Sequence, residues 1–375
     1  MARFKRKGRL VLTVLLVPLG VLFVLVVMLL VISPGRPSSI VDERGRPLAG
    51  SISEKIRVNI NGVDQGMFIR GRDTTKPVLL FVHGGAGMPE YFLAQRHPAA
   101  LEVLEEHFTV CWWERRGAGL SYSTSLSPGT MTIEQIIADL LAVTDYLRHR
   151  FDEQKIYLMA HSGGTFFALQ AVARSPQSYH AYIPIAQIVY QLKSENLAYQ
   201  YMLKRFQAIG DAAMVRRLEA ARPTMSGPLP ASYMAIRDKA MHRLGVGTTR
   251  QMRSVITGVF LPSLLSRDYT VAEKVNIWRG KVFSDRLLWN DILATDLTTM
   301  VTRVAIPVYF LHGIHDYTVT LAETKAYFEA LQAPVKGFYT FQRSAHSPMF
   351  EEPEWMRQII EQDVLRGTNS LADQR

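Results

Sequence analysis

The stretch that most constrains the fold is "KIYLMAHSGGTFFALQAV", where an apolar run ends at a serine and a second apolar run follows. A strand that turns sharply into a helix needs small residues around its turn, because larger side chains would clash there. Ala160 and Gly164 stand two positions before and two positions after Ser162. The stretch therefore predicts a strand, a tight turn and a helix, with Ser162 at the tip as a candidate nucleophile. The pattern alone is weak, because a structural serine at the end of a strand produces it too.

Short apolar runs alternate with segments of helical periodicity along most of the chain. The runs "PVLLFVHGG" and "FTVCWWERRG" are typical of buried strands, since strands covered on both faces are apolar throughout. Residues 132–151 carry apolar side chains at helical spacing, and Thr132 and Gln135 predict a capping box at the start of this helix. The alternation predicts an α/β fold in which helices cover both faces of a mostly parallel sheet.

Residues 188–301 interrupt this rhythm. They look mostly helical and contain no convincing buried strand, so they are predicted to form a helical cap inserted between two strands of the sheet. The predicted organisation is a basic cytoplasmic tail at 1–9, a transmembrane anchor at 10–32, a tether at 33–50, a core formed by 51–187 and 302–366, the helical cap at 188–301, and a C-terminal tail at 367–375.

The N-terminal segment from Leu10 to Ile32 contains no charged residue. It is long enough to cross roughly 30 Å of hydrocarbon as a helix. A cleaved signal peptide is the alternative, but its apolar region is usually shorter and ends in a small-residue cleavage site, which the following "VISPGRPSS" does not offer. Five basic residues precede the segment, so we expect an uncleaved anchor with a cytoplasmic N-terminus and the rest of the chain outside the cytoplasm. These residues are Arg3, Lys5, Arg6, Lys7 and Arg9.

The formal net charge of +10 raises nucleic acid and membrane as partners. About +5 of this charge lies in the first ten residues and about +7 lies between residues 188 and 301, with the remainder slightly negative. A basic tail and a basic insertion do not form a nucleic-acid groove, and no finger, basic-zipper or RNA-recognition pattern is present. We therefore expect no nucleic-acid partner. The single cysteine, Cys111, excludes an internal disulfide and is expected to be a packed core thiol.

The glycine-rich stretch "FVHGGAG" follows a predicted buried strand. Glycines at such a place let backbone N–H groups turn toward a substrate, and a hydrolase needs two such donors where a carbonyl oxygen becomes negative. We assign these donors to Gly85, with Gly84 as the alternative, and to Gly163, which follows the candidate nucleophile. His83 is expected to brace the loop by hydrogen bonding. A plain glycine-rich turn is the other interpretation.

Two further residues come after predicted strands near the C-terminus. Asp316 ends the apolar run of "YFLHGIHDYTV", and His346 lies in the loop "FQRSAHSPMF". The carboxyl ends of parallel strands meet at one edge of a sheet, where ligands bind. Metal binding by His312, His315 and Asp316 is the alternative for the first site, but residues three apart on a strand face opposite sides. The order Ser162, Asp316, His346 favours a Ser-His-Asp arrangement and no metal.

The motifs "HGGAG", "ERRGAGLS", "AHSGG", "GIHD" and "SAHSP" stand in this order between about residues 55 and 366. In this region the chain resembles the α/β-hydrolases, and most of all their proline iminopeptidase branch. The resemblance implies a catalytic triad of Ser162, Asp316 and His346, no cofactor, and a cap that selects the substrate. Glu195 resembles the acidic cap residues that bind the substrate's α-amine in that branch, although a solvated helix residue would look the same.

The chain departs from that branch at several positions. Ala86 replaces a proline, Glu114 and Arg115 replace Asp-Gln, and Gly163 stands where the branch usually carries tryptophan. The resemblance therefore implies the fold and the triad but leaves the preference for N-terminal proline open. We expect a membrane-anchored serine hydrolase that acts on a small molecule or short peptide as an aminopeptidase. The alternatives are a carboxyl-ester or lipid hydrolase and a non-catalytic binding scaffold.

Overall fold

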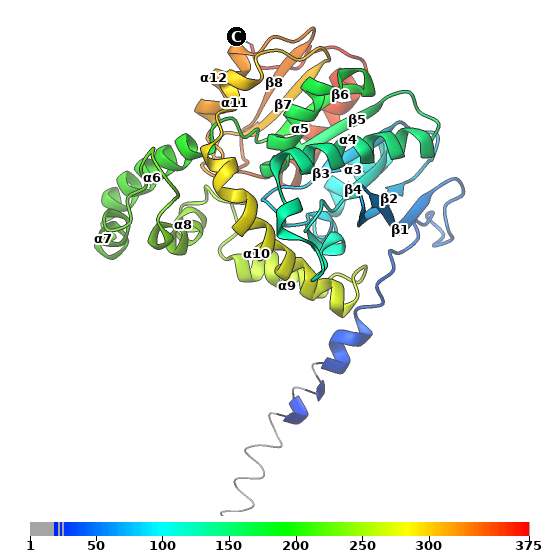
Figure 1. Cartoon of the computed structure of the whole chain (residues 1–375), viewed down its shortest axis with the longest axis horizontal. Helices are drawn as coiled ribbons and strands as arrows, with labels where there is room; N and C mark the ends of the chain where they lie inside the picture. Colours follow the sequence, from blue (N-terminus) through cyan, green and yellow to red (C-terminus); the bar gives the residue numbers. More distant parts are fainter. Residues whose placement is uncertain (1–18, 22, 25, 375) are drawn as a thin grey trace, which may run out of the picture.

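The computed structural model describes residues 19–21, 23, 24 and 26–374 (Figure 1). The predicted basic tail and the first part of the predicted anchor, residues 10–18, lie outside the described residues. The described residues between 19 and 31 are helical and extend away from the folded body (Figure 1). Among the described residues, no helix combines the length and apolar character that a membrane crossing needs.

An eight-stranded sheet forms the centre of the body, in the order β1-β2-β4-β3-β5-β6-β7-β8. The pairs from β4 through to β8 are parallel, whereas β1 and β2 join the sheet in antiparallel fashion. The mostly parallel α/β fold predicted from the alternating pattern is therefore confirmed. The strands are β1 Ile52–Ile60, β2 Val63–Gly71, β3 Val78–Val82, β4 Thr109–Trp113, β5 Ile156–His161, β6 Tyr179–Ile185, β7 Val308–Gly313 and β8 Lys336–Phe341.

Helices cover both faces of this sheet because strand side chains alternate between two apolar clusters. On β3, Leu80 packs in one cluster, while Leu79 and Phe81 pack in the other. The first cluster includes residues of α4 Ile133–Arg150, α5 Gly163–Arg174 and α12 Leu321–Ala330. The second includes residues of α2 Tyr91–Ala94, α3 Pro98–His107, α13 Pro348–Glu351, α14 Pro353–Ile359 and the π-helical turn η5 Ile360–Val364. Short 3₁₀ turns occur at η1 Gly119–Ser121, η2 Pro128–Thr130 and η3 Pro176–Ser178.

The start of α4 follows its prediction only in part. The Thr132 side chain accepts a hydrogen bond from the Gln135 backbone N–H, so Thr132 caps the helix. The Gln135 side chain does not return to Thr132, because it donates to Asp139 at 2.9 Å. The predicted capping box is therefore half formed. The buried Asp139 also accepts from Arg116 and Gln65, so it draws Gln135 away from the helix end.

The chain between β6 and β7 consists of helices in the described structure. They are α6 Gln191–Ala208, α7 Ala212–Glu219, α8 Ala231–Leu244, the π-helical turn η4 Ile256–Phe260, α9 Leu261–Leu265, α10 Val271–Ala294 and α11 Leu297–Met300. Helices α6 to α8 share a small apolar core of their own and project to one side, whereas α9 and α10 lie at the end from which the N-terminal helix extends (Figure 1).

The segments expected as tether and tail lie against the body. Gly35 N–H donates to the Arg267 carbonyl at 3.0 Å, and Ile40 is buried, so residues 33–50 are packed rather than free. At the other end, Asp373 N–H donates to the Phe338 carbonyl on β8, and the Asp373 carboxylate accepts from the N–H of Thr340. Both segments are thus held by backbone hydrogen bonds that the composition of the sequence does not reveal.

Candidate active site

Ser162 lies between β5 and α5 in a backbone conformation that few non-glycine residues adopt. Its φ is 50° and its ψ is −122°, which is costly unless the surroundings hold it in place. The neighbouring glycines explain why the turn can be so tight. A Cβ on Gly164 would lie 2.3 Å from the Val82 carbonyl oxygen, and one on Gly163 would lie 2.4 Å from that of Gly85.

The structure brings Ser162 together with His346 and Asp316, which follow β8 and β7. His346 Nε2 lies 2.7 Å from Ser162 Oγ, and His346 Nδ1 lies 2.8 Å from Asp316 Oδ2. All three side chains are buried. Because an ionised carboxylate can only accept, Nδ1–H donates to Asp316, and Nε2 is left to accept the hydroxyl proton of Ser162. The arrangement can therefore move a proton from the serine to the imidazole.

Asp316 is held as the charged form. Its Oδ1 accepts from the N–H groups of Thr318 at 2.8 Å and Val319 at 3.0 Å. Burial alone would raise the pKa of Asp316, but the facing His346 and these N–H donors lower it below its ordinary value. His312, considered above as a metal ligand, is buried and hydrogen-bonds the Val319 carbonyl instead. Within the described chain, no group of three or more His, Cys, Asp or Glu side chains is placed to hold a metal ion.

The glycine-rich loop after β3 lies directly against the serine turn. Gly85 has a φ of 57°, which favours glycine, and its backbone contacts Gly163 as described above. A Cβ on Gly84 would lie 3.1 Å from the Ser162 Cβ. Both candidates for the loop donor are thus beside the serine. The close approach of Gly85 leaves no room for a Cβ at position 163 with this backbone.

Arg115 holds this loop from behind. Its guanidinium donates to the carbonyl oxygens of four consecutive residues, 83 to 86, at 2.7–3.3 Å. His83 completes the brace as expected, because its ring nitrogens bond the Gly84 carbonyl and the Arg115 backbone N–H. The Arg115 side chain is fully buried over the Phe167 ring, and burial lowers its pKa to about 9. These hydrogen bonds turn the four carbonyl oxygens of the loop toward Arg115.

A second histidine–carboxylate pair lies beside His346. His161 Nδ1 is 2.6 Å from Glu90 Oε1, and His161 Nε2 is 2.9 Å from the backbone carbonyl of His346. A carbonyl can only accept, so Nε2 carries a proton and the pair shares another. Burial alone would lower the pKa of His161, but Glu90 and the carbonyl raise it above its ordinary value. The sequence analysis missed Arg115, His161 and Glu90. Two features of the sequence could have indicated these residues. His161 is adjacent to Ser162, and Arg115 stands in place of the motif's glutamine.

Glu195 of the cap is not open to solvent. Its carboxylate accepts from Arg237 Nε at 2.7 Å and from the Tyr233 hydroxyl at 3.1 Å, and Gln191 also donates to it. The side chain is completely buried. The alternative of a solvated helix residue is therefore wrong, and the charge of Glu195 is already balanced by Arg237. Its predicted role in binding an amine stays a prediction.

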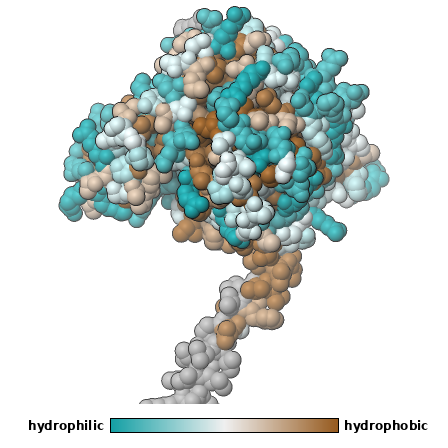
Figure 2. All heavy atoms as spheres, in the orientation of Figure 1, coloured by the Kyte–Doolittle hydropathy of each residue, from teal (hydrophilic) through white to brown (hydrophobic). Residues whose placement is uncertain are grey.

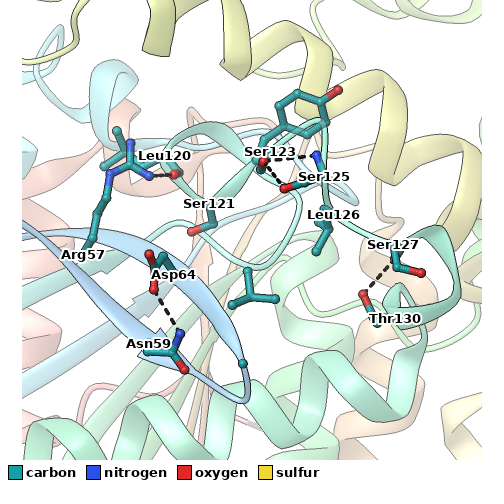
Figure 3. Close-up of a pocket in the computed structure, with 13 residues that line it drawn as sticks. Arg57, Asn59, Asp64, Leu120, Ser121, Ser123, Ser125, Leu126, Ser127 and Thr130 are labelled. Atoms are coloured by element: carbon teal, nitrogen blue, oxygen red, sulfur yellow. Dashed lines mark hydrogen bonds between the residues drawn. The ribbon is translucent and has the colours of Figure 1, made fainter.

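Two cavities differ in their relation to the site: none of the site residues described above lines the first, whereas Asp316 lines the second. The first, of about 560 Å³, lies between the β1–β2 hairpin and residues 120–130, and Figure 3 shows the hydroxyl-bearing side chains that line it. The Arg57 side chain there turns toward the Leu120 carbonyl, and Ser123 and Ser125 hydrogen-bond one another (Figure 3). The second, of about 530 Å³, lies between α6 and the segment after β7, and Asp316 is one of its lining residues. Of Ser162, His346 and Asp316, only Asp316 lines this cavity.

Comparison with known proteins agrees with this geometry. The family model for the serine aminopeptidases, S33, matches residues 73–353. The probable aminopeptidase YbaC of Bacillus subtilis (strain 168) is 31% identical over 309 residues, which cover 82% of this chain and 95% of that protein.

Solved structures show the same fold at low identity. The proline iminopeptidase of Mycobacterium smegmatis has a TM-score of 0.62 at 16% identity and covers 84% of this chain and 98% of its own. A membrane phospholipase A, described as a bacterial virulence factor, has a TM-score of 0.57 at 16% identity and covers 98% of this chain and 99% of its own. The chain is a hydrolase that belongs to the serine aminopeptidase S33 family of the α/β-hydrolase superfamily.

Proposed function

We propose that the protein is a membrane-anchored serine hydrolase that cleaves an acyl bond with a catalytic triad of Ser162, His346 and Asp316. The observation that carries this proposal is the continuous hydrogen-bond chain from Ser162 Oγ through His346 to Asp316, built on a strained turn. Such a chain is what an activated serine nucleophile needs.

In the first half of the reaction, Ser162 Oγ attacks the substrate carbonyl carbon while His346 Nε2 takes the hydroxyl proton. The carbonyl oxygen becomes an oxyanion, which the N–H groups of Gly85 and Gly163 stabilise. Asp316 keeps the imidazole in the required tautomer and stabilises its positive charge. When the tetrahedral intermediate collapses, His346 gives its proton to the leaving group, and an acyl-enzyme on Ser162 remains.

In the second half, His346 takes a proton from water as the water attacks the acyl carbonyl. The second tetrahedral intermediate collapses, Ser162 regains its proton from His346, and the acid product leaves. Arg115 and the Glu90–His161 pair act as positioning residues: Arg115 holds the oxyanion loop, and His161 holds the His346 backbone. The chemistry described here requires no metal or cofactor.

We propose the aminopeptidase activity because the matching family model is that of serine aminopeptidases and a 31% identical relative is described as a probable aminopeptidase. Glu195 is the proposed partner of the substrate's α-amine. A second candidate, a carboxyl-ester or lipid hydrolase, is favoured by the Arg237 guanidinium, which already neutralises Glu195 and leaves less negative charge for an amine. A panel of amino-acid anilides and acyl esters, compared by kcat/KM, separates the two activities.

We propose the anchor because the sequence from Leu10 to Ile32 has no charge and follows five basic residues. Most of the described apolar side chains of its second half are exposed; Phe23 and Val31 expose about 70% of their surface. The hydrolase domain would then face away from the cytoplasm. Protease added outside intact spheroplasts should digest the domain. Full protection of the domain would show that the orientation is the opposite one.

The triad is tested by Ser162→Ala. Turnover should fall by a factor on the order of 10⁴ to 10⁶, because only the oxyanion donors and substrate binding would remain. A fluorophosphonate probe should label the wild type at Ser162 and leave the variant unlabelled. The thermal unfolding of both proteins serves as the control for folding. Labelling of the variant, or normal turnover by it, would overturn the proposal.

A further inference from the structure

The cap exposes a group of large apolar side chains next to the N-terminal helix. Between residues 33 and 374, eleven large apolar side chains are exposed, and six of them lie in η4, α9 and α10. Figure 2 shows apolar residues gathered where the N-terminal helix meets the body. We call these six the α9 face: Ile256, Phe260, Leu261, Leu265, Val275 and Val282.

These residues lie on three helical segments that contact one another. Phe260, Leu261 and Leu265 fall within about two turns, and Val275 and Val282 are seven residues apart on the same side of α10. Helices α9 and α10 are in contact, and the Phe260 ring packs 5.2 Å from the Trp278 ring. Exposed apolar patches of this kind mark surfaces that bind another molecule or a membrane.

The end of the N-terminal helix is fastened to this same part of the cap. The buried Lys274 ammonium donates to Ser33 Oγ at 2.7 Å and to the Leu264 carbonyl at 2.6 Å. Gly35 N–H donates to the Arg267 carbonyl. The apolar helix therefore leaves the body immediately beside α9, so the helix and the α9 face lie at the same end of the body.

The stretch that carries the face exposes charge of one sign, and the exposed Asp291 lies nine residues beyond Val282 toward the other end of α10. Between residues 251 and 286, the exposed charged side chains are all arginines: Arg253, Arg267, Arg279 and Arg286. The acidic residues of this stretch are buried or half-buried, and Glu273 and Asp285 are paired with lysines. Apolar side chains surrounded by basic ones suit an anionic bilayer surface, since lipid tails accept the apolar groups and the head groups attract the cations.

We propose that the α9 face is a lipid-docking surface that lies on an anionic bilayer beside the N-terminal anchor. The inference rests on the anchoring proposed above. Docking would fix the cap at the membrane surface, because helix α10 carries Val275 and Val282 on one side while its Ser284 donates to the Gly117 carbonyl of the core. The hydrolase would then be held in one orientation to the lipid instead of turning freely about residues 33–50.

The test uses the full chain in vesicles of equal parts phosphatidylcholine and phosphatidylglycerol. Cys111 is the only cysteine and is completely buried, so a fluorophore attaches selectively to an introduced one. Leu261→Cys reports on the face, and Leu265→Cys is a second position in case the first impairs folding. Ile209→Cys, at the end of α6 and 56% exposed in the wild type, is the matched control.

Spin-labelled lipids should quench the fluorophore at 261 or 265 and leave the one at 209 unchanged. Quenching should weaken in vesicles of phosphatidylcholine alone, because the arginines lose their anionic partners. Flotation of the protein with the vesicles tests the anchor separately. An unquenched 261 label on protein that floats would overturn docking while the anchor stands. A label shielded from water but not quenched would show that a second copy covers the face, which also overturns the proposal.

Discussion

The core and the cap of this hydrolase use buried charge in opposite ways. In the core, no carboxylate of the described residues lies within ion-pair distance of Arg115, and its guanidinium binds the backbone carbonyls of residues 83–86. In the cap, Glu195 and Arg237 form an ion pair, and the Tyr233 hydroxyl donates a hydrogen bond to Glu195. A buried charge can therefore shape a loop, as Arg115 does, or stabilise a packing arrangement, as the Glu195–Arg237 pair does. A charge that shapes the loop affects the site directly, whereas a charge that stabilises helix packing affects the site through the stability of the cap.

The largest effect is expected from breaking the cap pair. Arg237→Gln leaves the Glu195 carboxylate buried without its cation, which should lower the free energy of unfolding by about 3–5 kcal/mol. The double variant Glu195→Gln/Arg237→Gln should recover much of that loss, because no uncompensated charge remains. Denaturant unfolding measures both variants. Equal stability of the single and double variants would show that the pair is not what holds the cap together.

The same pair tests the substrate class. If Glu195 binds an amine, Glu195→Gln should raise KM for amino-acid anilides well beyond its effect on acyl esters, since only the anilides carry a cation. Ratios of kcat/KM for the two substrates cancel any common loss through instability. Equal changes for both substrates would assign Glu195 to the cap structure and favour the ester hydrolase.

A change of Arg115 should affect turnover more than stability. Arg115→Met removes the donors that bind four loop carbonyls, so the oxyanion donors lose their alignment, and kcat should fall by about 10². KM should change much less. Arg115→Lys keeps the charge but not the planar fork and should recover only part of the rate. Titration of active sites with a fluorophosphonate corrects for any unfolded fraction, and a normal kcat per labelled site would contradict the positioning role.

The smallest effect concerns the Glu90–His161 pair. The pKa of His161 is raised in the folded state, so the pair's contribution to stability is complete below the ordinary histidine pKa and is lost as the pH rises through the folded value. Melting temperatures measured from pH 6 upward should fall for the wild type and remain flatter for His161→Gln. Parallel curves for the two proteins would show that this histidine does not hold the extra proton.

Sequence reasoning predicted that Ser162, Asp316 and His346 would lie together, because their order and their places after strands are local properties of the chain. The structure brings the three side chains within hydrogen-bond distance, and their catalytic role stays a prediction. The glycines beside the serine were found for the same reason. Sequence reasoning missed the role of Arg115 because its guanidinium binds backbone carbonyls about thirty residues earlier in the chain. Residue types do not reveal such backbone partners. The environment of Glu195 depends on Arg237, 42 residues away on another helix, so neither its burial nor its pairing could be inferred.

The packed C-terminal segment covers part of the outer edge of the sheet. Strand β8 is an outer strand of the sheet, and an outer strand exposes backbone groups that can pair with another chain. Asp373 occupies two of these groups, the Phe338 carbonyl and the Thr340 N–H, and places a carboxylate on the edge. The last described residues therefore act as protection against edge-to-edge aggregation.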